Sequence, residues 1–165
     1  MATAREWAAA YLAEGGADLS AAERLQGEQP SVTAMLAQMA LEKLAKAALL
    51  RSGLVTIERA RSTHAGATRL VQVVARDRRL SRRLGWRPEA VRALLSDIEE
   101  LERAQPSLAR GGPCLEYPWE DSAGVVRRPG IDLPIVAKFA AHSTRGQRIL
   151  GLARVLSDRF DEVFP

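Results

Sequence analysis

The chain has 165 residues and a formal net charge of +4, and aromatic residues make up only 5% of it. Alanine and leucine dominate its apolar content, and both enter helices at little entropic cost, so the composition favours helices over sheets. A single cysteine, Cys114, excludes an internal disulfide, and no apolar run reaches the roughly 18 residues of a membrane span, so we expect a cytoplasmic protein without a signal peptide.

The first predicted helix covers residues 4–14. Apolar residues recur there at helical spacing, and the pair Gly15 and Gly16 is expected to end the helix, as glycine does past a helix terminus. Ser20 is then predicted to cap a short turn over residues 21–26.

The second predicted helix opens with Pro30 and Ser31, has Arg51 in its last turn and carries the clearest apolar stripe of the chain. Ser31 is expected to accept hydrogen bonds from backbone N–H groups of the first turn, and Gly53 to follow the helix as a stop. Glu42 and Lys46 are one turn apart, so we predict an ion pair between them.

Two further helices are predicted in the middle of the chain. One starts at Ser62 or Thr63 and dissolves into an arginine-rich stretch over 76–87, and the next begins at Pro88, a residue suited to the first helical position. The inner stripe of the earlier helix consists of Ala67, Leu70, Val71 and Val74. The acidic residues placed on the outer side of the later helix are Glu99, Glu100 and Glu102.

The helical pattern breaks between residues 105 and 133, in a proline- and glycine-rich stretch that is too long for an ordinary connection. Tyr117, Trp119 and two valines flank a turn-like DSAG within it, so we expect an ordered loop or a small hairpin lying across the helices. A short helix over 134–141 and a final helix over 144–162 are predicted to follow. These elements predict an all-α fold with one domain over 1–165, an antiparallel bundle of four to five helices with the insert at about 105–133.

The order of the motifs resembles that of HEPN domains. The stretch SVTAMLAQMALEKLAKAALLRSG resembles the pattern A-x-x-x-x-EK-x-x-K-A-L followed by a glycine, carried here by Glu42, Lys43, Lys46 and Ala47. STHAGATRLVQVV resembles the entry into the next helix of the family, through Thr63, His64 and Leu70. EYPWEDSAGVVRRP resembles a tyrosine-proline loop before the last long helix of some members, and the whole resemblance spans about 7–160.

This resemblance implies an all-α bundle that is often dimeric. Many members are encoded or fused with a small nucleotidyltransferase in toxin–antitoxin pairs, and some are metal-independent ribonucleases with an R-x4-6-H motif. The chain has no Gly-Ser followed by D-x-D, so a nucleotidyltransferase partner would be a separate chain.

Arg59 and His64, within IERARSTHAG, have the spacing R-x4-H. A histidine can take the 2′-hydroxyl proton of RNA and an arginine can stabilise the charged phosphorane, so the pair points to RNA cleavage without a metal. The motif precedes the third predicted helix, whereas family ribonucleases generally carry it in a later helix, and Ala60 follows the arginine instead of a polar residue. The alternative is that His64 packs between helix ends and bonds to a neighbouring oxygen.

The densest basic patch lies between Arg76 and Arg87. Guanidinium groups bind phosphates in a bidentate way, so this patch predicts contact with RNA or nucleotides. The alternative is a solvated connection with salt bridges to Asp77 and to the acidic face of the fourth helix. The candidate binding residues are Arg61, Arg78, Arg79, Arg82, Arg83, Tyr117 and Trp119, and neither a metal site nor a cofactor is expected.

Three functional hypotheses follow. The first is a HEPN-like cytosolic binding module that is dimeric and engages a nucleotidyltransferase-type partner, RNA, or both. The second is a metal-independent endoribonuclease with Arg59 and His64 at its site. The third is a structural bundle that serves protein interaction alone.

Overall fold

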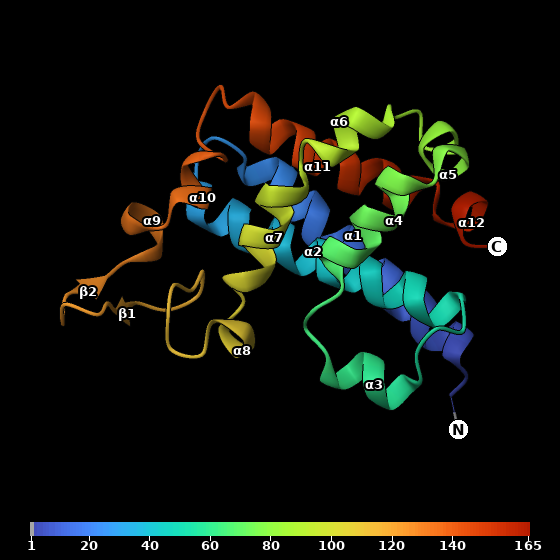
Figure 1. The fold of residues 1–165 in the computed structure, drawn as a ribbon, viewed down its shortest axis with the longest axis horizontal. Helices are drawn as coiled ribbons and strands as arrows, with labels where there is room; N and C mark the ends of the chain where they lie inside the picture. The colour runs from blue at the N-terminus through green and yellow to red at the C-terminus, as the bar shows by residue number, and fades with distance from the viewer. Residues whose placement is uncertain (1) are drawn as a thin grey trace.

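A computed structural model describes residues 2–165 of the chain, and the fold is mostly α-helical, as the sequence predicts (Figure 1). Two long helices, α1 (Ala4–Leu25) and α2 (Pro30–Arg51), run side by side, and α11 (Thr144–Asp158) packs against both. The shorter helices α4 (Ala67–Arg76) and α7 (Leu95–Arg103) lie against α2. Buried side chains from all five helices belong to one hydrophobic core.

The helix α1 continues through Gly15 and Gly16 to Leu25, so the predicted stop is wrong. A methyl group added at Gly15 would lie only 3.2 Å from Lys43 Cβ and 3.3 Å from the Ala40 carbonyl oxygen of α2. The glycine therefore lets the two long helices approach closely. Packing along α2 holds α1 together despite the weak helix propensity of glycine, because tertiary contacts supply most helix stability in proteins.

Two serines that were expected to cap helices lie inside them, so both predictions are wrong. Ser20 is within α1, and its hydroxyl donates to the Gly16 carbonyl oxygen at 2.9 Å. Ser31 is the second residue of α2, because Pro30 opens the helix and Gln29 is the N-cap residue, without a side-chain cap. Proline suits the first helical position since it has no N–H group to leave unpaired.

A short helix, α3 (Ile57–Ser62), follows α2 in the chain and precedes α4. The expected helix start at Ser62 or Thr63 is wrong, because α3 ends there and α4 begins only at Ala67, with Gly66 as its N-cap residue. The predicted inner stripe is confirmed, and its buried residues are Ala67, Leu70, Val71 and Val74.

The arginine-rich stretch is helical where the sequence predicted an irregular connection. Asp77 ends α4 and caps the next helix, α5 (Arg78–Arg83), by accepting the N–H groups of Arg79 at 2.8 Å and Leu80 at 3.2 Å. The helix predicted to begin at Pro88 does so, as α6 (Pro88–Arg92). The single helix predicted from Pro88 is divided into α6 and α7. At the break between them, the guanidinium of Arg145 donates to the Ala93 carbonyl oxygen.

The predicted hairpin is confirmed within the insert. After α8 (Pro106–Ala109), the strands β1 (Trp119–Glu120) and β2 (Val126–Arg127) pair antiparallel, with Trp119 opposite Arg127. The hairpin projects at one end of the long axis instead of lying across the helices (Figure 1). Of the four residues in the two strands, only Trp119 packs against the core, so the rest of the hairpin extends away from the helices.

After the hairpin, the chain returns to the helical body through α9 (Pro129–Asp132) and α10 (Pro134–Ala137), the second being the predicted short helix. The final predicted helix is interrupted at Arg159, whose guanidinium donates to the Arg83 carbonyl oxygen, and α12 (Phe160–Val163) follows α11. Among residues 2–165, no helix has the length and apolar character needed to cross a membrane.

Candidate functional site

A polar cluster surrounds the carboxylate of Glu42 on α2. Lys46, one turn later, places its Nζ 2.8 Å from Glu42 Oε1, which confirms the predicted ion pair. Gln38 Nε2 donates to Glu42 Oε2 at 3.1 Å. The side chains of Glu42 and Lys46 are only 13% and 8% exposed, and the Lys46 ammonium lies 5.4 Å from the ring centroid of Tyr11. This ion pair is therefore largely removed from water.

His64 adds an imidazole to this cluster from the loop between α3 and α4. Its Nδ1 lies 3.1 Å from Glu42 Oε1 and 3.2 Å from Gln105 Nε2. The N–H of Ser107 donates to Gln105 Oε1 at 2.8 Å, which orients the Gln105 amide so that its NH₂ group faces the imidazole. Nδ1 thus faces one acceptor and one donor, and its own proton decides which contact is a hydrogen bond.

The two tautomers of His64 have different chemistry. When Nδ1 carries the proton, it donates to Glu42, and Nε2 becomes a proton acceptor, as a general base requires. When Nε2 carries the proton, Nδ1 accepts from Gln105 and ties the loop to the start of the insert. The His64 side chain is 36% exposed, so part of the ring reaches solvent.

The structure does not join Arg59 to His64. Arg59 is exposed on α3, where its backbone N–H donates to Thr56 Oγ1 at 3.2 Å, and its guanidinium makes no hydrogen bond or ion pair within residues 2–165. Arg61, also exposed, stacks its guanidinium over the Trp7 ring at 5.4 Å. The R-x4-H spacing is therefore not a contacting pair here, and RNA cleavage stays a prediction.

Glu102 and Gln105 are the polar residues of this region that sequence reasoning missed. Glu102 was expected on the outer side of its helix, yet it is only 8% exposed, and its carboxylate accepts the N–H groups of Gly66 at 2.5 Å and Thr68 at 2.9 Å. An anion at a helix N-terminus is favoured by the helix dipole. The sequence feature that could have indicated this contact is Gly66, the N-cap residue of α4. Glycine has no side chain to accept the first N–H groups of the helix, so another residue must supply the acceptor.

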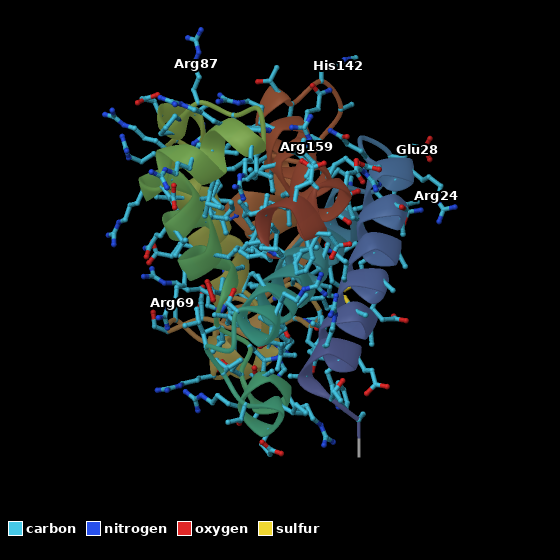
Figure 2. All side chains as sticks on the ribbon, turned by 90° about the vertical axis from the view of Figure 1, so that its right-hand side faces the viewer. Arg24, Glu28, Arg69, Arg87, His142 and Arg159 are labelled. Carbon is cyan, nitrogen blue, oxygen red and sulfur yellow. The ribbon has the colours of Figure 1, made fainter. Side chains whose placement is uncertain are left out.

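The helix α5 presents arginines to solvent. Arg78, Arg79 and Arg82 are exposed, and none of them forms a side-chain hydrogen bond or ion pair within the described chain. Figure 2 shows nitrogen-tipped side chains projecting on this side of the molecule, with Arg87 at its upper edge. An open depression of about 610 Å³ runs between α4 and α5, lined by Val73, Arg76, Asp77, Arg78 and Arg79. Arg83 differs, because it donates to the Glu162 carbonyl oxygen at 3.0 Å.

The carboxylates that the salt-bridge alternative named are engaged elsewhere, whereas Glu89 on α6 is exposed and forms no ion pair within residues 2–165. Asp77 accepts backbone N–H groups at the start of α5. On α7, Glu99 pairs with Arg103, Glu100 lies 2.9 Å from the Lys138 ammonium, and Glu102 binds the start of α4. The salt bridges proposed as the alternative for this patch are therefore absent within residues 2–165.

The two candidate aromatic residues of the insert have different surroundings. Trp119 is half-buried and packs against the core, so it anchors the hairpin. Tyr117 is 61% exposed. Only Tyr117 is therefore open to a partner.

In residues 2–165, His, Cys, Asp and Glu side chains form no group of three or more that could hold a metal ion. Comparisons with protein-family models, with curated proteins and with solved structures find no match to this chain.

Proposed function

We propose that this protein is a HEPN-like helical module that binds RNA through the arginines of α5. The observation that carries the proposal is the exposure of Arg78, Arg79 and Arg82 together with the absence of any ion pair to them within residues 2–165. A guanidinium group matches the geometry of a phosphate and binds it through two parallel hydrogen bonds. Three such groups on one short helix suit a chain of phosphates better than a single anion.

Backbone binding of this kind has a measurable signature, because each neutralised phosphate releases counterions. We expect the affinity for a fluorescent single-stranded RNA to fall steeply with KCl. Replacing Arg78, Arg79 and Arg82 with alanine should weaken binding by at least about tenfold and reduce the slope of log K against log salt by about 2, at about 0.7 per phosphate contact.

The matched control replaces Arg5, Arg24 and Arg148 with alanine. These arginines are also exposed, and their removal lowers the net charge by the same amount. Figure 2 shows Arg24 on α1, at the side of the molecule opposite Arg69. Equal losses of RNA affinity in both triple variants would show that only the overall charge matters, and this would contradict a binding site on α5.

A metal-independent endoribonuclease is the second candidate function. It is favoured by the contact of His64 Nδ1 with Glu42, because the tautomer that donates its Nδ1 proton to this carboxylate has Nε2 free to act as a base. We expect such an enzyme to degrade RNA in EDTA and to lose this activity in His64→Ala and in Arg59→Ala. Intact RNA after incubation with a high concentration of the protein would exclude it. The RNA-binding measurement is separate, because it uses the arginines of α5.

A nucleotidyltransferase partner in a toxin–antitoxin pair stays a prediction that the HEPN resemblance alone supports. The neighbouring gene is the decisive observation. An adjacent nucleotidyltransferase that co-purifies with this chain would support it.

A further inference from the structure

An apolar groove lies beside the arginines of α5, between the end of α2, α4 and the C-terminal residues. Ala48 and Leu70 are its buried members, whereas Leu54 and Val73 are 65% and 46% exposed. Phe164 adds an aromatic side chain that is only partly buried. The groove encloses about 120 Å³, well below the roughly 300–1,000 Å³ of a pocket for a drug-sized ligand. It therefore has room for a single planar ring system.

A Schellman motif at the end of α2 fixes one wall of the groove. The N–H of Leu54 donates to the Leu49 carbonyl oxygen at 3.0 Å. The N–H of Gly53 donates to the Leu50 carbonyl oxygen at 3.1 Å, and Gly53 has the left-handed φ of 64° that this turn requires. Leu54 is thus held in place although most of its side chain is exposed. The groove is open before a ligand binds, so filling it costs little conformational entropy.

The groove is continuous with the basic depression between α4 and α5, because Val73 lines both. Beyond Val73, the depression carries Arg76, Arg78 and Arg79, none of which forms an ion pair within residues 2–165. Asp77 is the carboxylate among the lining residues, and it accepts backbone N–H groups at the start of α5. An apolar recess and a set of guanidinium groups therefore share one surface.

Charge is distributed unevenly along this surface. Among the residues that line the groove, Arg69 carries a charge, and Figure 2 shows its side chain projecting on the side where α4 and α5 lie. Two carboxylates come shortly before Phe164 in the chain. Asp161 pairs with Arg51, and Glu162 is exposed without an ion pair in the described chain. The groove is therefore close to neutral, whereas the depression beside it is basic.

We propose that a strand of RNA bound by α5 inserts one unpaired base into the apolar groove, with its adjacent phosphates at Arg69 and Arg76. A nucleotide joins an apolar ring to an anionic phosphate, so it matches a neutral recess beside guanidinium groups. Proteins hold unpaired bases through apolar and aromatic contacts to the ring faces, while basic side chains follow the backbone. The two arginines are about 10 Å apart along the axis of α4, on either side of Val73. This base subsite depends on the RNA binding that we propose for α5.

Two probes of equal length separate the base from the backbone. One is a labelled oligoadenylate, and the other is the same ribose-phosphate chain without bases. We expect the unchanged chain to bind the oligoadenylate about tenfold more tightly in fluorescence anisotropy, as for one base held by stacking. The slope of log K against log salt should be the same for both probes, because phosphate contacts set it.

Exchanging the apolar rim for hydroxyl groups tests the groove itself. The rim variant carries Leu54→Ser and Val73→Ser, which leave the charge unchanged, and it should bind oligoadenylate about tenfold more weakly but the chain without bases as before. The matched control carries Val125→Ser and Val126→Ser in the hairpin, where the two valines are 45% and 65% exposed. It should bind both probes like the unchanged chain. Circular dichroism and thermal melting establish that each variant is folded.

Loss of the base subsite and loss of the phosphate site are separate results. Equal affinity of the unchanged chain for the two probes would overturn the base subsite and leave the site on α5 standing. A rim variant that keeps its affinity for oligoadenylate would do the same, and this is the outcome expected if the groove receives a segment of another protein instead. A triple alanine variant of α5 that binds both probes like the unchanged chain would overturn the RNA site on α5 and the base subsite with it.

Discussion

Basic side chains have opposite surroundings in the Glu42 cluster and on the helix α5. Lys46 is 8% exposed and lies beside a carboxylate, whereas Arg79 is exposed and has no carboxylate partner in the described chain. A charge removed from water requires a partner because its desolvation costs several kcal/mol, and an exposed charge has no such requirement. The comparison separates charges that stabilise the fold from charges that remain free to bind another molecule.

The largest expected effect comes from breaking the buried pair. Glu42→Ala leaves the Lys46 ammonium without its carboxylate, so we expect the free energy of unfolding to fall by about 3 kcal/mol. Urea denaturation measures this loss. Adding Lys46→Met removes the stranded charge and should restore part of the stability. A loss no greater than that of an exposed substitution would show that this pair is solvated like the arginines of α5.

The next effect concerns the start of α4. Glu102→Ala removes the carboxylate that binds the N–H groups of Gly66 and Thr68, and we expect a loss of about 2 kcal/mol, as for hydrogen bonds to a charged group. Glu99→Ala on the same helix is the control, because its partner Arg103 is exposed and such surface pairs contribute about 0.3 kcal/mol. Equal losses in the two variants would contradict the capping role.

The arginines of α5 should contribute little to stability. We expect the triple alanine variant of Arg78, Arg79 and Arg82 to change the free energy of unfolding by less than about 0.5 kcal/mol, because exposed side chains without partners have only small effects. The same variant is expected to lose RNA affinity. Strong destabilisation would show that these arginines support the fold and would remove the contrast with the Glu42 cluster.

The smallest effect is local and depends on pH. The N–H of Val125 and the guanidinium of Arg127 hold the pKa of the Asp121 carboxyl below its ordinary value of 3.8. Because folding lowers this pKa, the Asp121 carboxylate stabilises the hairpin fully when the pH is above the ordinary value. This stabilisation is lost as the pH falls through the lowered pKa of the folded hairpin. Amide hydrogen exchange of Ala123 and Val125 should therefore accelerate, relative to neighbouring amides, only in strongly acidic solution.

Asp121→Asn is the control for this titration. The amide of asparagine carries no charge and does not titrate. In this variant the exchange of the Ala123 and Val125 amides should be faster at neutral pH and should no longer change in acid. Protection that falls already around pH 6 would point to a different group.

Apolar spacing predicted the helical elements best where the buried side chains of a helix lie on one face. The stripe from Ala67 to Val74 and the start at Pro88 were read correctly from single segments. Gly53 was read correctly as the stop after α2, where it follows the C-cap residue at a φ of 64°.

The signals in α1 were misread, because Gly15 and Ser20 carry the usual marks of a helix end but lie within that helix. The neighbours that override these signals come from other helices: Ala40 and Lys43 of α2 lie against Gly15, and Arg154 of α11 donates to the Ser20 hydroxyl.

The candidate sites also differ in how far the sequence could predict them. The arginine patch and the pair of Glu42 with Lys46 could be predicted because their members are close in sequence. Gln105 could not be predicted, since it lies 41 residues from the His64 ring that it contacts. Its sequence neighbourhood gives no indication of a buried polar contact.

The sequence by itself determined that this protein is helical, that an ordered insert interrupts the helices, and that arginines gather beside α4. These properties follow from propensity, periodicity and local charge, which act over a few residues. Only the tertiary structure decided which charges find partners, because it brings Glu102 to the start of α4 and His64 to Glu42 across long separations. A buried charge must be paired wherever the chain folds, and that requirement separates the structural charges from those left free to bind.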